Sequence, residues 1–237
     1  MFYVRVLLLF IWIMLVSVYF FLQLPFRWGD IRLDHEFSRA FGKLAQKICG
    51  LEVLVENAQQ FRSTVPAVYV ANHQGAIDVV NFASVCGPNV IIIAKKEIVW
   101  VPFFGLFFKG AGNILIDRKN RSQSVSGLSQ AVRAIRERGA QIYIFPEGTR
   151  NRTSDLMLPF KKGAFHTAIA AQVPVVPFVC SPVKDLVNWK EKKIRGGRVI
   201  LKALQPVSTL GMTTDDVDRL SHQVRESMLE ALRGLSV

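Results

Sequence analysis

The sequence has little of what several common classes of small protein require. Its 237 residues include only three cysteines, which are far apart and form no CxxC pair: Cys49, Cys86 and Cys180. This excludes a disulfide scaffold and argues against a zinc knuckle or a thioredoxin-type redox site, so we expect reduced, buried thiols. The chain also lacks repeats and low-complexity segments, which excludes a collagen-like or disordered protein.

Two catalytic signatures are missing as well. There is no GxSxG motif, the turn that presents the nucleophilic serine of α/β-hydrolases, so no covalent intermediate on serine is expected. There is no HExxH motif, and the four histidines are scattered along the chain: His35, His73, His166 and His222. The sequence therefore predicts neither a metal ion nor another cofactor.

Acidic residues are scarce relative to basic ones. The chain has 18 Asp and Glu against 30 Lys and Arg, a formal charge of +12, and every charge except that of Arg5 lies after residue 26. A basic body suits an anionic partner, such as a membrane surface, a nucleic acid or an acidic substrate. No known nucleic-acid-binding motif occurs, and we expect no nucleic-acid partner.

The N-terminus is strongly apolar. Residues 6–22 contain no polar side chain except Ser17, and at about 1.5 Å per residue they span about 25 Å of a bilayer core that is about 30 Å thick. No small-residue cleavage site follows, which argues against a removable signal peptide, and a buried core helix is the other alternative. We expect this segment to associate with a membrane, either spanning it or lying in one leaflet.

The next segment, 36–48, has apolar residues at helical spacing with cations between them. This pattern is typical of an amphipathic helix, which would lie on anionic headgroups or pack on its own domain. We therefore divide the chain into membrane-associating helices at 1–50 and a catalytic domain at 51–237. The basic residues that follow the apolar run favour a cytosolic domain at the inner, cytoplasmic membrane.

From residue 51 onward, short apolar runs alternate with helical patterns. Strands are predicted at 51–55, 67–71, 90–94, 113–116, 141–145, 173–179 and 198–201, and helices at 121–138, at 164–171 and from Thr213 or Thr214. Continuous apolar runs are typical of strands that are covered on both faces. The alternation predicts an α/β fold with a mostly parallel central sheet flanked by helices. The prolines of 173–179 indicate an edge strand or a bend.

A histidine and an aspartate follow the second predicted strand, within the motif NHQGAID. His73 stands at the strand end and Asp78 five residues later. Sites in α/β sheets lie beyond the carboxyl ends of the strands. A neutral His73 there would serve as a general base, and Asp78 would fix its tautomer by accepting the other ring N–H. The H-x4-D spacing alone is more often a structural histidine beside a helix-capping aspartate.

An anion-binding pattern, FPEGTR, follows the fifth predicted strand. Gly148 and Thr149 offer backbone N–H groups and a hydroxyl, and Arg150 adds a fork that matches phosphate. Glu147 would hold Arg150 or orient a substrate hydroxyl, and Lys161 adds a cation shortly afterwards. The alternative is a solvated surface turn.

A third motif, GNILIDR, ends in Arg118 just past the fourth predicted strand. The aromatic run at 100–108 upstream would line an acyl groove or simply fill the core.

Four blocks, NHQGAID, GNILIDR, FPEGTR and VPVVPF, occur in this order over residues 72–179. In these blocks the chain resembles the HX4D glycerolipid acyltransferase superfamily, and within it the bacterial 1-acyl-sn-glycerol-3-phosphate (lysophosphatidic acid) acyltransferases. The resemblance implies catalysis by His73 with Asp78 and a structural Pro177. It further implies an acceptor-phosphate site whose members are Arg118, Glu147, Gly148, Thr149 and Arg150, with Lys161 as a further cation.

The implied reaction moves an acyl group from acyl-CoA or acyl-ACP to the sn-2 hydroxyl of lysophosphatidic acid at the bilayer. The product is phosphatidic acid, an intermediate of phospholipid biosynthesis. Three alternatives stay open. In the first, the acceptor is another lysolipid, such as a lysophospholipid or a lyso-aminolipid. In a membrane-anchored thioesterase or esterase, His73 would instead activate water. In the third alternative, the chain is a lipid-binding protein without catalytic activity.

Overall fold

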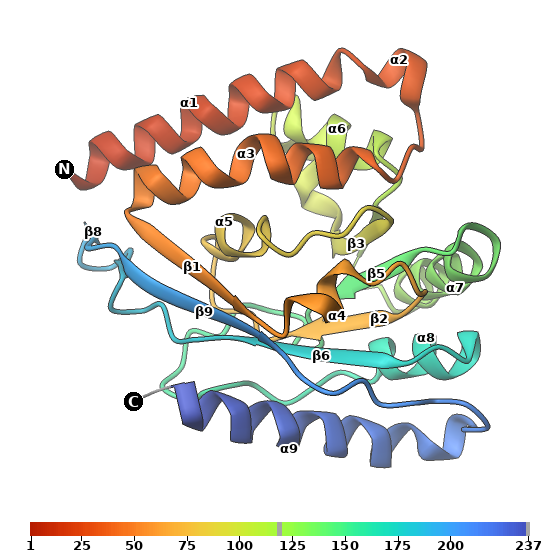
Figure 1. The fold of residues 1–237 in the computed structure, drawn as a ribbon. Helices are drawn as coiled ribbons and strands as arrows, with labels where there is room; N and C mark the ends of the chain where they lie inside the picture. The colour runs from red at the N-terminus through yellow and green to blue at the C-terminus, as the bar shows by residue number, and fades with distance from the viewer. Residues whose placement is uncertain (118–119, 236–237) are drawn as a thin grey trace.

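The computed structural model of the chain describes residues 1–117 and 120–235. Within this part, seven strands form one central sheet in the order β1-β9-β6-β2-β5-β3-β4 (Figure 1). The strands are β1 (Leu51–Glu56), β2 (Val68–Ala71), β3 (Val90–Lys95), β4 (Ile114–Ile116), β5 (Gln141–Ile144), β6 (Val175–Cys180) and β9 (Gly197–Ala203). Only the β6–β9 pair is antiparallel among these neighbours. The predicted α/β fold with a mostly parallel sheet is confirmed.

Helices cover both faces of the sheet (Figure 1). One face carries α7 (Arg121–Arg138), α8 (Gly163–Ala171) and α9 (Val217–Leu235). The other carries α1 (Phe2–Phe21), α3 (Leu33–Cys49), α5 (Asp78–Phe82) and α6 (Phe104–Gly110). The shorter elements are α2 (Leu24–Arg27), α4 (Ala58–Arg62), the hairpin of β7 (Val187–Asn188) and β8 (Lys193–Ile194), and 3-10 turns at Lys96–Trp100 and Thr214–Asp216.

Strand β2 shows why the sheet could be recognised from continuous apolar runs. Its four residues are all buried. Val68 and Val70 join the apolar cluster beneath α7, α8 and α9, whereas Tyr69 and Ala71 join the cluster beneath α3. Successive side chains of a strand point to opposite faces, so a strand covered on both sides has no polar position.

The helix ends also follow local chemistry. Helix α7 begins after Asn120, whose side chain accepts a hydrogen bond from the N–H of Gln123, and it ends at Gly139 in the left-handed conformation (φ 62°). Thr213 and Asp216 form a capping box ahead of α9. These contacts satisfy backbone groups that a helix terminus leaves unpaired, and the predicted starts and stops agree with them.

Helix α1 lies along the outside of α3 and α6 (Figure 1). It buries Val16, Ser17 and Phe20 against them, and the indole of Trp12 donates to the carbonyl oxygen of Phe41. Its outward face is apolar and exposed, at Tyr3, Val4, Leu7, Leu8, Phe10, Ile11, Leu15 and Tyr19. The helix is long and apolar enough to cross a membrane. An apolar helix that is mostly exposed is not a core helix, and it indicates membrane association.

Helix α3 directs its apolar side inward. Phe37, Phe41 and Ala45 are buried in the same cluster as Tyr69 and Phe178 of the sheet. The amphipathic pattern thus reflects packing on the chain's own body. Helices and sheet share one apolar core, and the division at residue 50 stays a prediction.

Of the two alternatives that the prolines of β6 indicate, an edge strand or a bend, the edge strand is wrong. Strand β6 lies between β2 and β9, inside the sheet. On the side of β9, Pro177 contributes only its carbonyl oxygen, which accepts the N–H of Leu204 at 2.8 Å between the Val175–Val207 bridge and the Phe178–Ala203 pair. An interior strand tolerates proline where its N–H is not needed for the ladder.

Candidate active site

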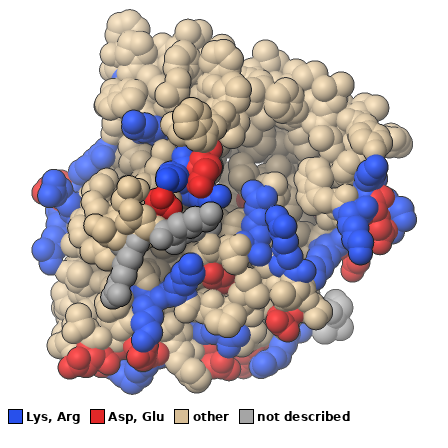
Figure 2. All heavy atoms as spheres, turned by 180° about the vertical axis from the view of Figure 1, so that it is seen from behind, with Lys and Arg blue, Asp and Glu red and all other residues tan. Residues whose placement is uncertain are grey.

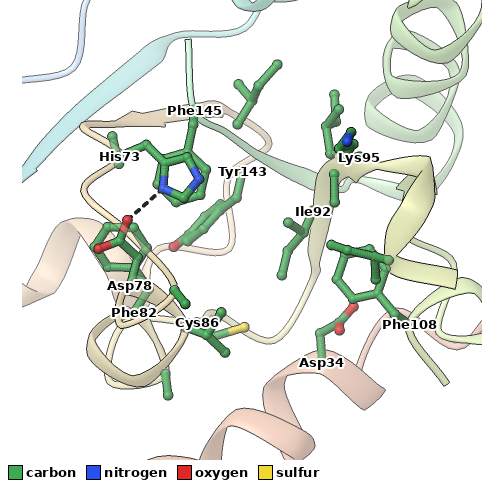
Figure 3. A pocket seen from close by; sticks show the side chains of 18 of the residues that line it. Asp34, His73, Asp78, Phe82, Cys86, Ile92, Lys95, Phe108, Tyr143 and Phe145 are labelled. Carbon is green, nitrogen blue, oxygen red and sulfur yellow. Dashed lines mark hydrogen bonds and ion pairs between the residues drawn. The ribbon is translucent and has the colours of Figure 1, made fainter. Parts of the chain in front are cut away.

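A cavity of about 560 Å³ lies at the carboxyl ends of β2, β3 and β5. This is within the usual range of small-molecule sites, about 300–1,000 Å³. Figure 3 shows His73 and Asp78 on one wall, with Ile92, Lys95 and Phe108 on the opposite side. Most other lining residues are apolar, so the cavity joins a polar catalytic wall to a space suited to hydrocarbon.

His73 and Asp78 are in direct contact. The ring Nδ1 lies 2.6 Å from Asp78 Oδ2, and the same oxygen accepts the backbone N–H groups of Gln74 at 2.8 Å and Gly75 at 3.1 Å. Asp78 is the first residue of α5 and is only 1% exposed. Three donors on one oxygen fix the carboxylate, which in turn fixes the ring and leaves Nε2 for a substrate.

Phe145 holds the plane of the His73 ring. The two rings are stacked, with centroids 4.0 Å apart and planes inclined by 13°. Phe82 of α5 stacks on Phe145 in turn, at 5.5 Å. The imidazole therefore has little freedom to tilt, and its free nitrogen keeps one direction. No sequence pattern indicates this role of Phe145, because stacking depends on how β5 and α5 meet.

The turn that carries His73 is tied to the end of β6. The Asn72 side chain donates to the carbonyl of Cys180 and accepts from its N–H, at 3.0 and 2.8 Å. Gln74 donates to the carbonyl of Ser181 at 2.9 Å and accepts from the N–H of Val183 at 3.0 Å. Two segments more than a hundred residues apart are thereby held in register. No sequence pattern indicated the role of Gln74.

Glu147 points away from the cavity. Its side chain is buried, Oε1 accepts the N–H of His73 at 2.6 Å, and Oε2 accepts the N–H of Leu158 at 2.8 Å. Burial raises the pKa of this carboxyl, while the two backbone hydrogen bonds lower it. Both oxygens are occupied by backbone, and neither holds Arg150, which differs from the expected placement of this residue.

The remaining predicted binding residues fall into two groups. Thr149 and Arg150 line the same cavity as His73 and are exposed. Gly148 and Lys161 line a second cavity of about 330 Å³, which shares the Phe145 wall with the first. Arg118 lies outside the described residues.

Two basic residues at the cavity were missed, Lys95 at the end of β3 and Arg152. Arg152 lines the cavity together with Arg150. The available signal was its position two residues beyond Arg150, where a second basic side chain follows the FPEGTR motif.

The aromatic run at 100–108 does two things at once. Phe104, Phe107 and Phe108 of α6 line the cavity, and Phe107 stacks on Phe37 of α3 with ring centroids 4.7 Å apart. The same rings therefore fill the core between α3 and α6 and form the apolar wall. The two alternatives from the sequence, core and groove, therefore apply to the same rings, which fill the core and also line the cavity.

Comparison with known proteins gives the family. Residues 52–181, more than half of the chain, match the acyltransferase family model. The chain is 40% identical over 193 residues to the 1-acyl-sn-glycerol-3-phosphate acyltransferase alpha of Mus musculus. This chain belongs to the acyltransferase family. The alignment covers 81% of this acyltransferase and 67% of the mouse protein.

Bacterial relatives are matched over more of their length. This acyltransferase is 37% identical to the 1-acyl-sn-glycerol-3-phosphate acyltransferase of Haemophilus influenzae, over 84% of this chain and 81% of the relative. The crystal structure of the 1-acyl-sn-glycerophosphate acyltransferase of Thermotoga maritima superposes with a TM-score of 0.73 at 23% identity, covering 99% and 98% of the two chains. The fold is shared, and the family expected from the four sequence blocks is confirmed.

Proposed function

We propose that this acyltransferase transfers a fatty acyl group from acyl-CoA or acyl-ACP to the sn-2 hydroxyl of lysophosphatidic acid, giving phosphatidic acid. The observation that carries the proposal is the His73–Asp78 pair on the wall of an apolar cavity that is also lined by Arg150. The relatives named above are 1-acyl-sn-glycerol-3-phosphate acyltransferases, which supports this acceptor.

The proposed reaction is one direct transfer. His73 Nε2 takes the proton of the acceptor hydroxyl while the oxygen attacks the thioester carbonyl. Asp78 stabilises the imidazolium that forms, the carbon–sulfur bond breaks, and the proton passes to the leaving thiolate. The products are an ester and a free thiol. A positioned base of this kind contributes about 10²–10⁴-fold.

Positioning of the acceptor contributes more. Holding two reactants in the right geometry supplies up to about 7–11 kcal/mol of the barrier. Arg150 and Arg152 stand at the cavity of His73, and we propose that they bind the acceptor phosphate with Thr149. Lys161 and Gly148 line the adjoining cavity and would extend this anion-binding site. Arg118 belongs to the same proposal on the ground of its motif alone. Glu147 would serve the site by fixing the His73 backbone.

The surface supports a membrane location for this chemistry. Figure 2 shows a face whose upper half has few charges, whereas its lower half carries many Lys and Arg side chains beside a hollow. The upper half includes α1 and α6, since both lie at the top of Figure 1. We propose that this half contacts the inner membrane and that the basic body faces the cytosol, where it attracts polyanionic acyl donors.

The proposal is tested with His73→Ala in mixed micelles. Phosphatidic acid formation should fall by at least about 10²-fold, because the base is lost, while the melting temperature stays near that of the wild type. His166→Ala is the matched control, since His166 is exposed on α8. Near-normal turnover of His73→Ala would end the assignment of this base. If the wild-type product is free fatty acid instead of phosphatidic acid, the chain is a thioesterase.

A further inference from the structure

The hairpin of β7 and β8 has no part in the proposed mechanism. It forms a separate two-stranded sheet, and none of its residues lines either cavity described above. It lies beside the N-terminal end of α1 (Figure 1). Val187 at its base is 5% exposed, whereas the residues of its turn, 189–192, are all exposed. Packing therefore accounts for the base of the hairpin but not for the chemistry of its turn.

Helix α1 is fixed to this hairpin and to the body of the chain. Arg5 donates to the carbonyl oxygen of Ile194 in β8 at 2.9 Å and to that of Cys49 at the end of α3 at 3.3 Å. Farther along α1, Trp12 donates to the carbonyl oxygen of Phe41 at 3.0 Å. Because these contacts hold α1 along the body, a bilayer that contacts its apolar outer face also meets the hairpin.

Two ring contacts join the turn of the hairpin to the first residues of α1. The rings of Trp189 and Phe2 meet edge to face with centroids 5.6 Å apart, and Nζ of Lys192 lies 5.6 Å from the ring centroid of Tyr3. Trp189 and Tyr3 are still about half or more exposed, at 48% and 66%. Exposed tryptophan and tyrosine at the border of an apolar surface are typical of the membrane–water interface.

The hairpin also carries an excess of positive charge. Residues 188–195 contain four basic side chains and one acidic side chain, all exposed: Lys190, Lys192, Lys193, Arg195 and Glu191. Glu191 pairs with both Lys193 at 3.1 Å and Arg195 at 3.6 Å, so a single carboxylate is shared and the excess remains. Figure 2 shows basic and acidic side chains gathered at the edge where the hairpin lies, directly below the part with few charges.

We propose that the β7–β8 hairpin binds anionic lipid headgroups and so docks the N-terminal end of α1 on a negatively charged bilayer. This rests on the membrane contact of α1 proposed above. The apolar face of α1 enters the acyl-chain region, Trp189 lies at the interface, and the basic turn stays at the level of the lipid phosphates. An acidic soluble protein fits less well, because it would leave the apolar face beside the turn exposed to water.

The size of the effect follows from the number of cations in the turn. Each Lys or Arg close to an anionic bilayer strengthens binding by about 5-fold, and the attraction falls off within about 10 Å at moderate salt. Loss of two cations from the turn should therefore lower the preference for anionic over neutral bilayers by about 10–30-fold.

The experiment measures flotation of the full chain with vesicles, after its detergent has been diluted below the critical micelle concentration. The vesicles contain phosphatidylcholine alone or phosphatidylcholine mixed with phosphatidylglycerol. The wild type should bind both kinds and prefer the anionic mixture, and the preference should shrink at high salt. Lys190→Gln combined with Lys192→Gln should lose most of this preference. It should keep the wild-type melting temperature and affinity for phosphatidylcholine, since both side chains are exposed.

Arg219→Gln combined with Arg233→Gln is the matched control. Both arginines are exposed on α9, which lies across the sheet from α1 (Figure 1). The control removes the same net charge from a surface that faces away from the proposed bilayer, so it should keep the wild-type preference for anionic vesicles.

Three results would overturn the proposal. The first is an unchanged preference for anionic vesicles in the folded Lys190→Gln, Lys192→Gln variant. The second is a raised KM of that variant for acyl-ACP without any change in flotation, which would assign the turn to the acyl donor. The third is a wild type that floats with neither kind of vesicle, which would also end the membrane contact of α1. Flotation needs no acyl donor, so its result is independent of the reaction proposed for His73.

Discussion

Glu147→Gln separates two roles of this residue, acceptor binding and positioning of His73. The carboxylate accepts one backbone N–H on each oxygen, from His73 at 2.6 Å and from Leu158 at 2.8 Å. Glutamine has a single acceptor oxygen, so its NH₂ group must face one of these two donors. The substitution therefore leaves a buried N–H unpaired without changing the size of the side chain.

The expected magnitude follows from that unpaired group. A buried donor without an acceptor costs about 1–3 kcal/mol, which for a chain of this size lowers Tm by roughly 2–12 °C. Because the His73 backbone loses an anchor or moves, kcat should fall, and a displacement of about 1 Å is enough for about 10²-fold. The KM for lysophosphatidic acid should change little, since Glu147 does not line either cavity described above.

The assay is initial-rate kinetics in mixed micelles at saturating donor, combined with thermal unfolding. Glu230→Gln, at an exposed position of α9, is the control and should match the wild type in both measurements. An unchanged kcat and Tm together with a tenfold rise in acceptor KM would refute the positioning role. That result would return Glu147 to the acceptor-binding role expected from its motif.

Two further predictions concern charged groups at the cavity. Arg150→Ala should raise the KM for lysophosphatidic acid by about 10–100-fold through loss of a charged hydrogen bond, and equal losses with an uncharged monoacylglycerol would show that Arg150 does not read phosphate. Burial raises the pKa of Asp34 from 3.8 to about 7, so the folded state holds a proton that the unfolded chain has lost. Wild-type stability should therefore fall from pH 4 to 7, by up to about 4 kcal/mol relative to Asp34→Asn. Thermal unfolding in detergent at pH 5 and 8 tests this, and a constant gap between the two proteins contradicts it.

The strands were predictable because the sheet is covered on both faces. A strand such as β2 has no polar position, and its continuous apolar run is visible in the sequence. The helices α5 and α6 were not predicted. Helix α6 is short and built around Gly105, which approaches the backbone of Ile98 and Val99 closely, so its formation depends on tertiary contacts. Local propensity carries little information in such a segment.

The motifs identified which residues stand near the site but not which way they face. His73 and Asp78 lie five positions apart and meet, because Gly75 and the start of α5 return the chain. Glu147 and Thr149 are two residues apart, yet one is buried beneath His73 and the other faces the cavity. That difference is set by the turn after β5 and by Leu158, which lies beyond the motif. The spacing of the two residues in the sequence does not predict which side chain is buried.

The shared core of α3 and the sheet limits how this protein is handled. A fragment that begins at residue 51 would lose Phe37, Phe41 and Asp34, and with them one whole side of the cavity. It would also uncover Tyr69 and Phe178, two rings that are now almost fully enclosed. Truncation of the N-terminal helices to obtain a water-soluble form would therefore expose apolar core surface and leave a cavity that lacks one wall. Crystallisation and ligand screening need the intact chain with detergent or lipid.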